Sequence, residues 1–194
     1  MVEVDIAVAT VQKKNENVVL MQCNTNYTAS LENFKYINLN VLKEFARKYP
    51  TAVLGLSDHT PRHATVLGAV SLGARVIEKH FTEDITRNGP DHKFSMDPTS
   101  WKDMVNRTRE LELALGSTIK KIEDNEKDTV IIQRRALRAT RELKKGDCLT
   151  FDCVEALRPC PEDALPPYEL EKVLNKTLTQ DVAQGDCLTW KSLN

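Results

Sequence analysis

The chain has 194 residues, and its 27 Lys and Arg residues against 28 Asp and Glu residues give a formal charge of −1 at pH 7. This balance excludes the strongly basic surface of a general nucleic-acid binder. The apolar runs are too short to cross a bilayer, and the first residues lack the basic segment of a secretory signal peptide. We therefore expect a cytoplasmic protein with no nucleic-acid or membrane partner.

The cysteines point to the same compartment. There are five of them, an odd number, and none belongs to a Cys-x-x-Cys pair. We expect reduced and mostly buried thiols rather than a disulfide framework or a structural zinc site.

The first two thirds of the chain alternate helical and strand patterns. Val4, Val8 and Val11 are spaced by four and three residues, which predicts a helix over 4–14. Short apolar runs predict three buried strands, at 18–21, 52–56 and 75–77. Helices are expected between them, at 39–49 and 62–73. Strands connected through helices in this way are parallel, which predicts an α/β fold.

A fourth helix is predicted from its capping residues. Asp97 followed by Pro98 is a favourable N-cap and first-turn pair, and Gly116 ends the pattern. The helix is expected to bury one face, made of Trp101, Met104, Val105, Thr108, Leu111 and Leu115.

The pattern of apolar and charged residues changes after this helix. We assign residues 1–116 to the first domain, 117–129 to a charged linker and 130–194 to a small, mainly β domain. The last contains an internal repeat, because Gly-Asp-Cys-Leu-Thr at 146–150 recurs at 185–189. Each copy is expected to be a glycine turn that leads into a strand.

Two histidines follow neighbouring predicted strands. His59 and His80 each stand just past a buried strand, 21 residues apart. Parallel strands lie about 4.8 Å apart, so the two imidazoles can converge on one ion, with Asp58 and Glu78 as nearby carboxylates. Such donors suit Mn, Fe, Co or Zn better than Ca. The alternative is that both histidines form hydrogen bonds at strand ends and bind no metal.

A polar loop lies near the same edge. His92 belongs to the turn-rich segment 88–93, and His63 stands in the first turn of a predicted helix, where we expect it to be solvated. The loop is either a ligand-facing segment or an ordinary exposed turn.

Motifs in this region resemble those of the sialic acid synthase family. They are Gly-Leu-Ser-Asp-His-Thr at 55–60, Val-Ile-Glu-Lys-His-Phe-Thr at 76–82, Gly-Pro-Asp-His at 89–92 and Ser-Met-Asp-Pro at 95–98. The segment 21–27 resembles the preceding strand and loop of that family, and residues 130–194 resemble its antifreeze-like SAF domain, including Leu-Arg-Pro at 157–159.

The resemblance implies a fold and an activity. The fold would be the last three strands of a (β/α)8 TIM barrel followed by an antifreeze-like SAF domain of the β-clip type. The activity would be a transferase reaction that condenses phosphoenolpyruvate with an N-acetylated aminosugar such as N-acetylmannosamine, giving a nine-carbon 2-keto sugar acid and phosphate.

The resemblance also implies roles for individual residues. His59 and His80 would hold a divalent metal, with manganese preferred and magnesium or cobalt as alternatives. The other implied roles are Glu78 near the reacting centre, Ser57 and Thr25 toward phosphoenolpyruvate, Tyr27 and Asp91 toward the aminosugar, and Arg158 toward the partner's site in a domain-swapped homodimer.

The chain departs from the family in its number of strands. A complete barrel has eight strands and about 250 residues, whereas three strand-helix units precede the linker here. The chain is expected to start at the helix before the sixth strand and to have no synthase activity by itself. A non-catalytic module that binds carbohydrate or a partner, and one half of a split synthase, are the alternatives.

Overall fold

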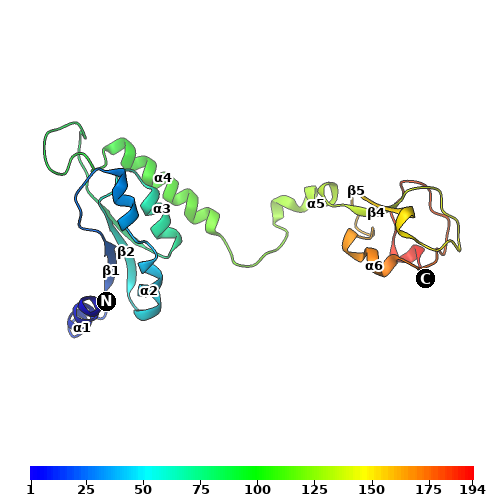
Figure 1. The fold of residues 1–194 in the computed structure, drawn as a ribbon, viewed down its shortest axis with the longest axis horizontal. Coiled ribbons are helices and arrows are strands. Elements are labelled where there is room, and N and C mark those ends of the chain that lie inside the picture. Colours follow the sequence, from blue (N-terminus) through cyan, green and yellow to red (C-terminus); the bar gives the residue numbers. More distant parts are fainter. The chain divides into compact units, whose positions relative to one another are not determined.

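A computed structural model describes residues 1–194 as two compact units, Met1–Thr118 and Ile119–Asn194. The first is a small α/β unit and the second a smaller unit with short strands and helices (Figure 1). No helix in either unit combines the length and the apolar composition needed to span a bilayer.

The first unit is built on a three-stranded parallel sheet. The strands are β1 (Val19–Cys23), β2 (Val53–Asp58) and β3 (Val76–Lys79), in the spatial order β1-β2-β3. The helices around it are α1 (Val2–Gln12), α2 (Val41–Lys48), α3 (Ala64–Ser71) and α4 (Pro98–Leu115). The predicted order of elements and the parallel pairing are therefore confirmed for this unit.

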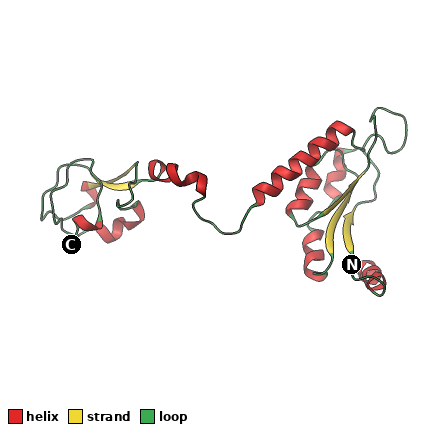
Figure 2. Ribbon diagram, turned by 180° about the vertical axis from the view of Figure 1, so that it is seen from behind, coloured by secondary structure: helices red, strands yellow, loops and turns green.

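One face of the sheet is covered by helices and the other is open (Figure 2). Leu54 and Leu56 of β2 pack among apolar side chains of α2 and α3. Side chains alternate along a strand, so Gly55 and Ser57 belong to the opposite face. On that face Val19 and Val53 are about half exposed. The open face continues to the strand ends, where the candidate site lies.

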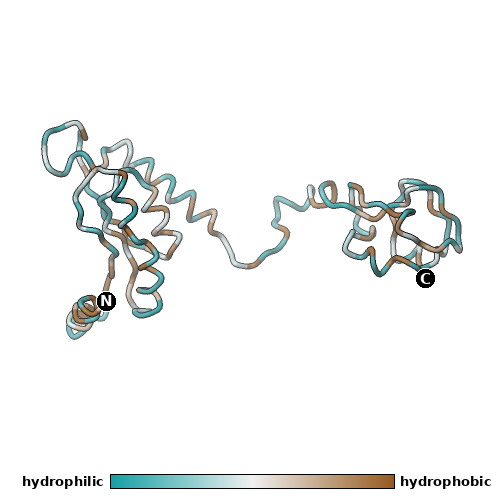
Figure 3. Tube along the Cα trace, in the orientation of Figure 1, coloured by the Kyte–Doolittle hydropathy of each residue, from teal (hydrophilic) through white to brown (hydrophobic).

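Helix α1 buries only part of its apolar surface. Val8 is buried and Val4 packs against the core of the sheet, but Val11 of the predicted face is half exposed. Figure 3 shows α1 as a mostly hydrophobic segment, and Val2 and Ile6 are 72% and 62% exposed.

Helix α4 begins as its sequence predicts. The Asp97 carboxylate accepts the Ser100 N–H at 2.8 Å, and Ser100 Oγ accepts the Asp97 N–H at 3.0 Å. Gly116 follows the helix with a φ of +48°. Its buried face is narrower than expected, because Met104 alone is fully buried while Val105 and Leu115 are exposed. The helix contacts α3 along a single stripe, which leaves the flanking positions in solvent.

The second unit contains an approximate internal two-fold symmetry. Strands β4 (Ala136–Ala139) and β5 (Val154–Leu157) are antiparallel. The repeated turns have φ values of +92° at Gly146 and +83° at Gly185. The Leu149 N–H donates to the Lys176 carbonyl at 2.9 Å, and the Leu188 N–H, 39 residues later, donates to the Leu137 carbonyl at 2.8 Å. Each turn leads to a single bridge residue and a short 3-10 turn rather than to the expected strand.

The structure differs from the expectations in its short helices and in the burial of its cysteines. Helix α5 (Lys127–Gln133), preceded by a 3-10 turn at Asp124–Glu126, occupies the end of the expected linker and the start of the expected β domain. A second short helix, α6 (Leu170–Val173), also lies in the unit. The expectation of mostly buried thiols is wrong, because only Cys153 is fully buried and Cys23 and Cys148 are exposed.

Candidate metal and substrate site

The site lies where β2 and β3 end. Ser57 pairs in register with Glu78, and Asp58 pairs with Lys79. His59 and His80 are therefore the first residues after the two strands. Their ring centroids are 5.1 Å apart. His59 is 3% exposed, whereas the His80 side chain is 28% exposed. The structure therefore brings together the two histidines that the sequence selected.

Each imidazole has a partner at Nδ1. His59 Nδ1 lies 2.9 Å from the carbonyl oxygen of Asn24, which can only accept, so this nitrogen carries the proton. His80 Nδ1 lies 3.6 Å from the Asp91 carboxylate. Histidines that bind metals commonly direct the other ring N–H toward a carbonyl or carboxylate in this way. The arrangement leaves both Nε2 atoms available to an ion.

A serine–glutamate pair adjoins the histidines on the open face. Ser57 Oγ donates to Glu78 Oε1 at 2.9 Å, and the Glu78 side chain is exposed to solvent. Because side chains alternate along a strand, this pair is on the same face as His59 and His80. The face thus presents a hydroxyl, a carboxylate and two imidazoles to a ligand.

Aromatic rings border the two histidines. The ring centroid of Tyr27 is 4.3 Å from that of His59, and the Tyr27 side chain is about half exposed. Phe94 is buried, and its centroid is 5.0 Å from that of His80. Phe94 was not predicted to be near the histidines, because a single aromatic residue in a polar loop has no pattern that indicates its neighbours. Its neighbour Met96, whose N–H bonds to the His80 carbonyl, is part of the same local framework.

Asp58 does not belong to this face, so its expected position as a carboxylate beside the metal is wrong. It is one residue out of phase with Ser57 and His59, and its side chain is buried toward α3. There it forms an ion pair of 2.7 Å with Lys79. Burial lowers the pKa of Lys79, and the Asp58 carboxylate partly offsets this effect.

Thr25 and Arg158 are the remaining predicted site residues. Thr25 is exposed in the loop after β1 and forms no hydrogen bond with either imidazole. Arg158 belongs to the second unit, where its Nε donates to the Gln133 carbonyl at 2.7 Å.

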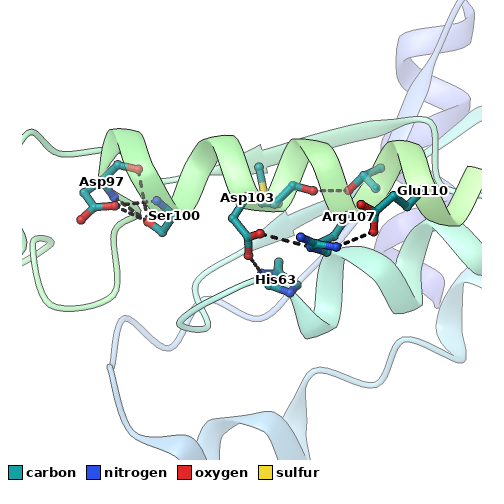
Figure 4. A network of polar contacts seen from close by, with 8 residues as sticks. His63, Asp97, Ser100, Asp103, Arg107 and Glu110 are labelled. Carbon is teal, nitrogen blue, oxygen red and sulfur yellow. Dashed lines mark hydrogen bonds and ion pairs between the residues drawn. The ribbon is translucent and has the colours of Figure 1, made fainter.

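The remaining histidines have structural partners. His63 precedes α3 and lies 3.5 Å from Asp103 of α4, and it is partly buried rather than solvated. Figure 4 shows that Asp103 also accepts from Arg107, which in turn reaches Glu110. This network links the start of α3 to α4. His92 Nδ1 lies 2.7 Å from Thr82 Oγ1, which orders the polar loop.

The donor set fits part of a metal site. Two imidazoles suit Zn or Fe, and they suit Mn where carboxylate or water oxygens complete the coordination sphere. No group of three or more His, Cys, Asp or Glu side chains in the chain is arranged to hold an ion. Water, substrate or groups outside this chain would therefore complete the coordination sphere. The group formed by His59, His80, Ser57 and Glu78 contains no Lys or Arg, because Lys79 points into the core.

Comparisons with known proteins identify the family of the chain. The NeuB family profile matches residues 1–120, and the SAF domain profile matches residues 134–194. The chain is 35% identical to an N,N'-diacetyllegionaminic acid synthase of Legionella pneumophila, covering 98% of this chain and 53% of that protein. It is 36% identical to a pseudaminic acid synthase of Campylobacter jejuni, covering 91% and 50%.

Solved structures show the same relationship. The spore coat polysaccharide biosynthesis protein spsE of Bacillus subtilis is 28% identical with a TM-score of 0.55, covering 100% of this chain and 58% of that one. An N-acetylneuraminic acid synthetase of Leptospira borgpetersenii is 29% identical with a TM-score of 0.57, covering 66% and 44%. The chain spans about half the length of the curated relatives it matches. Because the family profile matches residues 1–120 and the relatives are 35–36% identical over most of the chain, the chain belongs to the NeuB family.

Proposed function

We propose that this chain carries part of the active site of a synthase that condenses phosphoenolpyruvate with an N-acetylated aminosugar. The observation that carries the proposal is the pair His59 and His80, with both Nδ1 atoms engaged and both Nε2 atoms available beside Ser57 and Glu78. The names of the related synthases support the same class of reaction. We also propose a cytoplasmic location.

His59 and His80 would hold the divalent cation through Nε2, manganese in the first place and magnesium or cobalt as alternatives. A bound cation supplies Lewis acidity toward the aldehyde oxygen of the open-chain sugar. The Asn24 carbonyl and the Asp91 carboxylate fix the two ring orientations. Tyr27 and Asp91, next to the imidazoles, are proposed to hold the aminosugar.

Water is the only reactant that the proposed reaction needs besides phosphoenolpyruvate and the aminosugar. C3 of phosphoenolpyruvate forms a bond to the aldehyde carbon, whose oxygen takes up a proton. Water adds at C2 and gives up one proton, which leaves a hydroxyl group there. That hydroxyl then passes its proton to the leaving phosphate as the C2–O bond to phosphate breaks and the C2 carbonyl forms. Glu78 is proposed to act near the reacting carbon, and Ser57, with Thr25 as a weaker candidate, to contact the phosphate.

Other parts of the active site must come from elsewhere. The cluster has no basic side chain to neutralise phosphate, and three parallel strands do not close a barrel. Arg158 of the SAF domain is proposed to reach the partner's site in a domain-swapped homodimer. We also propose that the 194-residue polypeptide by itself releases no phosphate from phosphoenolpyruvate with manganese and N-acetylmannosamine.

Manganese binding tests the site directly. Loss of the free Mn²⁺ electron paramagnetic resonance signal measures binding to the chain. We expect His59→Ala and His80→Ala to abolish binding, while His63→Ala and His92→Ala serve as controls that keep it. Equal binding by all four variants and the unchanged chain would refute the metal site.

A second candidate is a synthase assembled from two polypeptides, which the open sheet face favours. Strands β1 and β3 each pair on one side only, and the face between them carries the proposed site. Mixing the chain with the N-terminal half of a family member should restore phosphate release if the two associate. The mass of the native polypeptide, captured with an antibody to residues 130–194, separates the cases. About twice 21.9 kDa indicates one longer chain. A mass of 21.9 kDa indicates that the short form is real and acts either with a complementing polypeptide or as a binding module.

A further inference from the structure

A buried ion pair lies directly behind the two histidines. Asp58 and Lys79 are register partners on β2 and β3, and each immediately precedes one of the histidines in sequence. Both side chains are completely buried, and Lys79 Nζ lies 2.7 Å from Asp58 Oδ2. They are on the helix side of the sheet, whereas His59 and His80 follow on the open side.

The pair is tied to the backbone on both sides of His59. Lys79 Nζ donates to the Thr60 carbonyl at 2.6 Å, and the Thr60 N–H donates to Asp58 Oδ1 at 3.0 Å. The Thr60 hydroxyl and the Thr65 hydroxyl of α3 also bond to the Asp58 carboxylate. One ammonium group on the strand of His80 thus holds both residues that flank His59.

Stability alone is a poor reason for such a pair. Removing two charges from water is costly, and replacement of a buried ion pair by apolar residues of similar volume is often neutral or stabilising. Directional hydrogen bonds, by contrast, fix geometry in a way that apolar contacts do not. The position of the pair, one residue before each imidazole, is where such fixing would set the spacing of the two Nε2 atoms.

We propose that Asp58 and Lys79 are positioning residues that lock the ends of β2 and β3 together and so hold the imidazoles of His59 and His80 at metal-binding distance. The metal part of this inference rests on the proposed function. Neither residue touches the ion; both act through the backbone at 58–60 and 79–80. Outer groups of this kind change metal affinity by about 10–100-fold when they are removed.

The test separates positioning from general stability. The variants are Lys79→Met and the double variant Asp58→Asn/Lys79→Met, which removes both charges, keeps both side-chain volumes and retains an acceptor for the Thr60 N–H. The control is Val70→Ala, a buried position of α3 in a separate apolar cluster. The readouts are the Mn²⁺ dissociation constant of the full chain, its urea unfolding midpoint, and the ring ¹⁵N shifts of the two histidines.

We expect the double variant to keep the wild-type unfolding midpoint but to bind Mn²⁺ about 10–100-fold more weakly, with altered ¹⁵N shifts for His59 and His80. The control should lose stability and keep its manganese affinity and its shifts. A double variant with wild-type affinity overturns the inference.

Failure of the proposed function has a different signature. In that case the unchanged chain binds no manganese, and His59→Ala has no effect on the titration. The ¹⁵N shifts then decide the positioning claim alone: altered shifts in the double variant support it, and unaltered shifts overturn it.

Discussion

Replacement of Gly55 by alanine tests how closely β2 and β3 are packed beneath the candidate site. A Cβ atom at this position would lie 2.8 Å from the Val76 carbonyl oxygen of β3 and 2.8 Å from Met21 Cγ of β1. The methionine side chain can turn away, but the carbonyl can move only if the two strands separate. Forced contacts of this kind cost about 1–3 kcal/mol, and the loss of unfolded-state freedom returns about 0.4–1 kcal/mol.

The expected result is a net loss of about 1–2 kcal/mol in the free energy of unfolding. Gly68→Ala is the matched control, because its new Cβ meets only the terminal methyl of Leu39, at 2.7 Å. Alanine is also favoured over glycine inside a helix, by about 0.5–1 kcal/mol. The control should therefore be neutral or slightly stabilising.

Urea unfolding followed by tryptophan fluorescence measures both variants. The chain has two tryptophans, Trp101 in the first unit and Trp190 in the second. In a Trp190→Phe background, Trp101 reports the first unit alone. If Gly55→Ala is as stable as Gly68→Ala, the reasoning about strand spacing is wrong.

Two further predictions concern packing and charge. Leu149 and Leu188 occupy equivalent, fully buried positions of the repeat. Replacing either by alanine should lower the free energy of unfolding of the second unit by about 2–5 kcal/mol and leave the Trp101 unfolding transition unchanged. A shift of that transition would contradict the expectation that the two units unfold independently. Hydrogen bonds from Lys48 and then Tyr49 lower the pKa of Asp5 from 3.8, so its contribution is present above that pH and is lost as the pH falls through the folded-state value. Urea titrations across acidic pH measure the difference in free energy of unfolding between Asp5→Asn and the unchanged chain. This difference should become smaller as the pH falls, and a difference that grows in acid would disprove the lowered pKa of Asp5.

The sequence alone determined the features that depend on local rules. The cap at Asp97, the stop at Gly116 and the repeated glycine turns follow from side-chain hydrogen bonds and from φ values that only certain residues adopt easily. The proximity of His59 and His80 follows from strand spacing and from the parallel connection. These inferences need only neighbours in the chain.

Only the tertiary structure decided the rest. It placed Asp58 behind the sheet with Lys79, because the two faces of a strand become different only once helices cover one of them. It supplied Phe94 and the Asn24 carbonyl to the histidines from loops that are distant in sequence. It also left Val105 and Leu115 of the predicted α4 face in solvent, because burial depends on which neighbours a helix has and its own apolar period does not specify them.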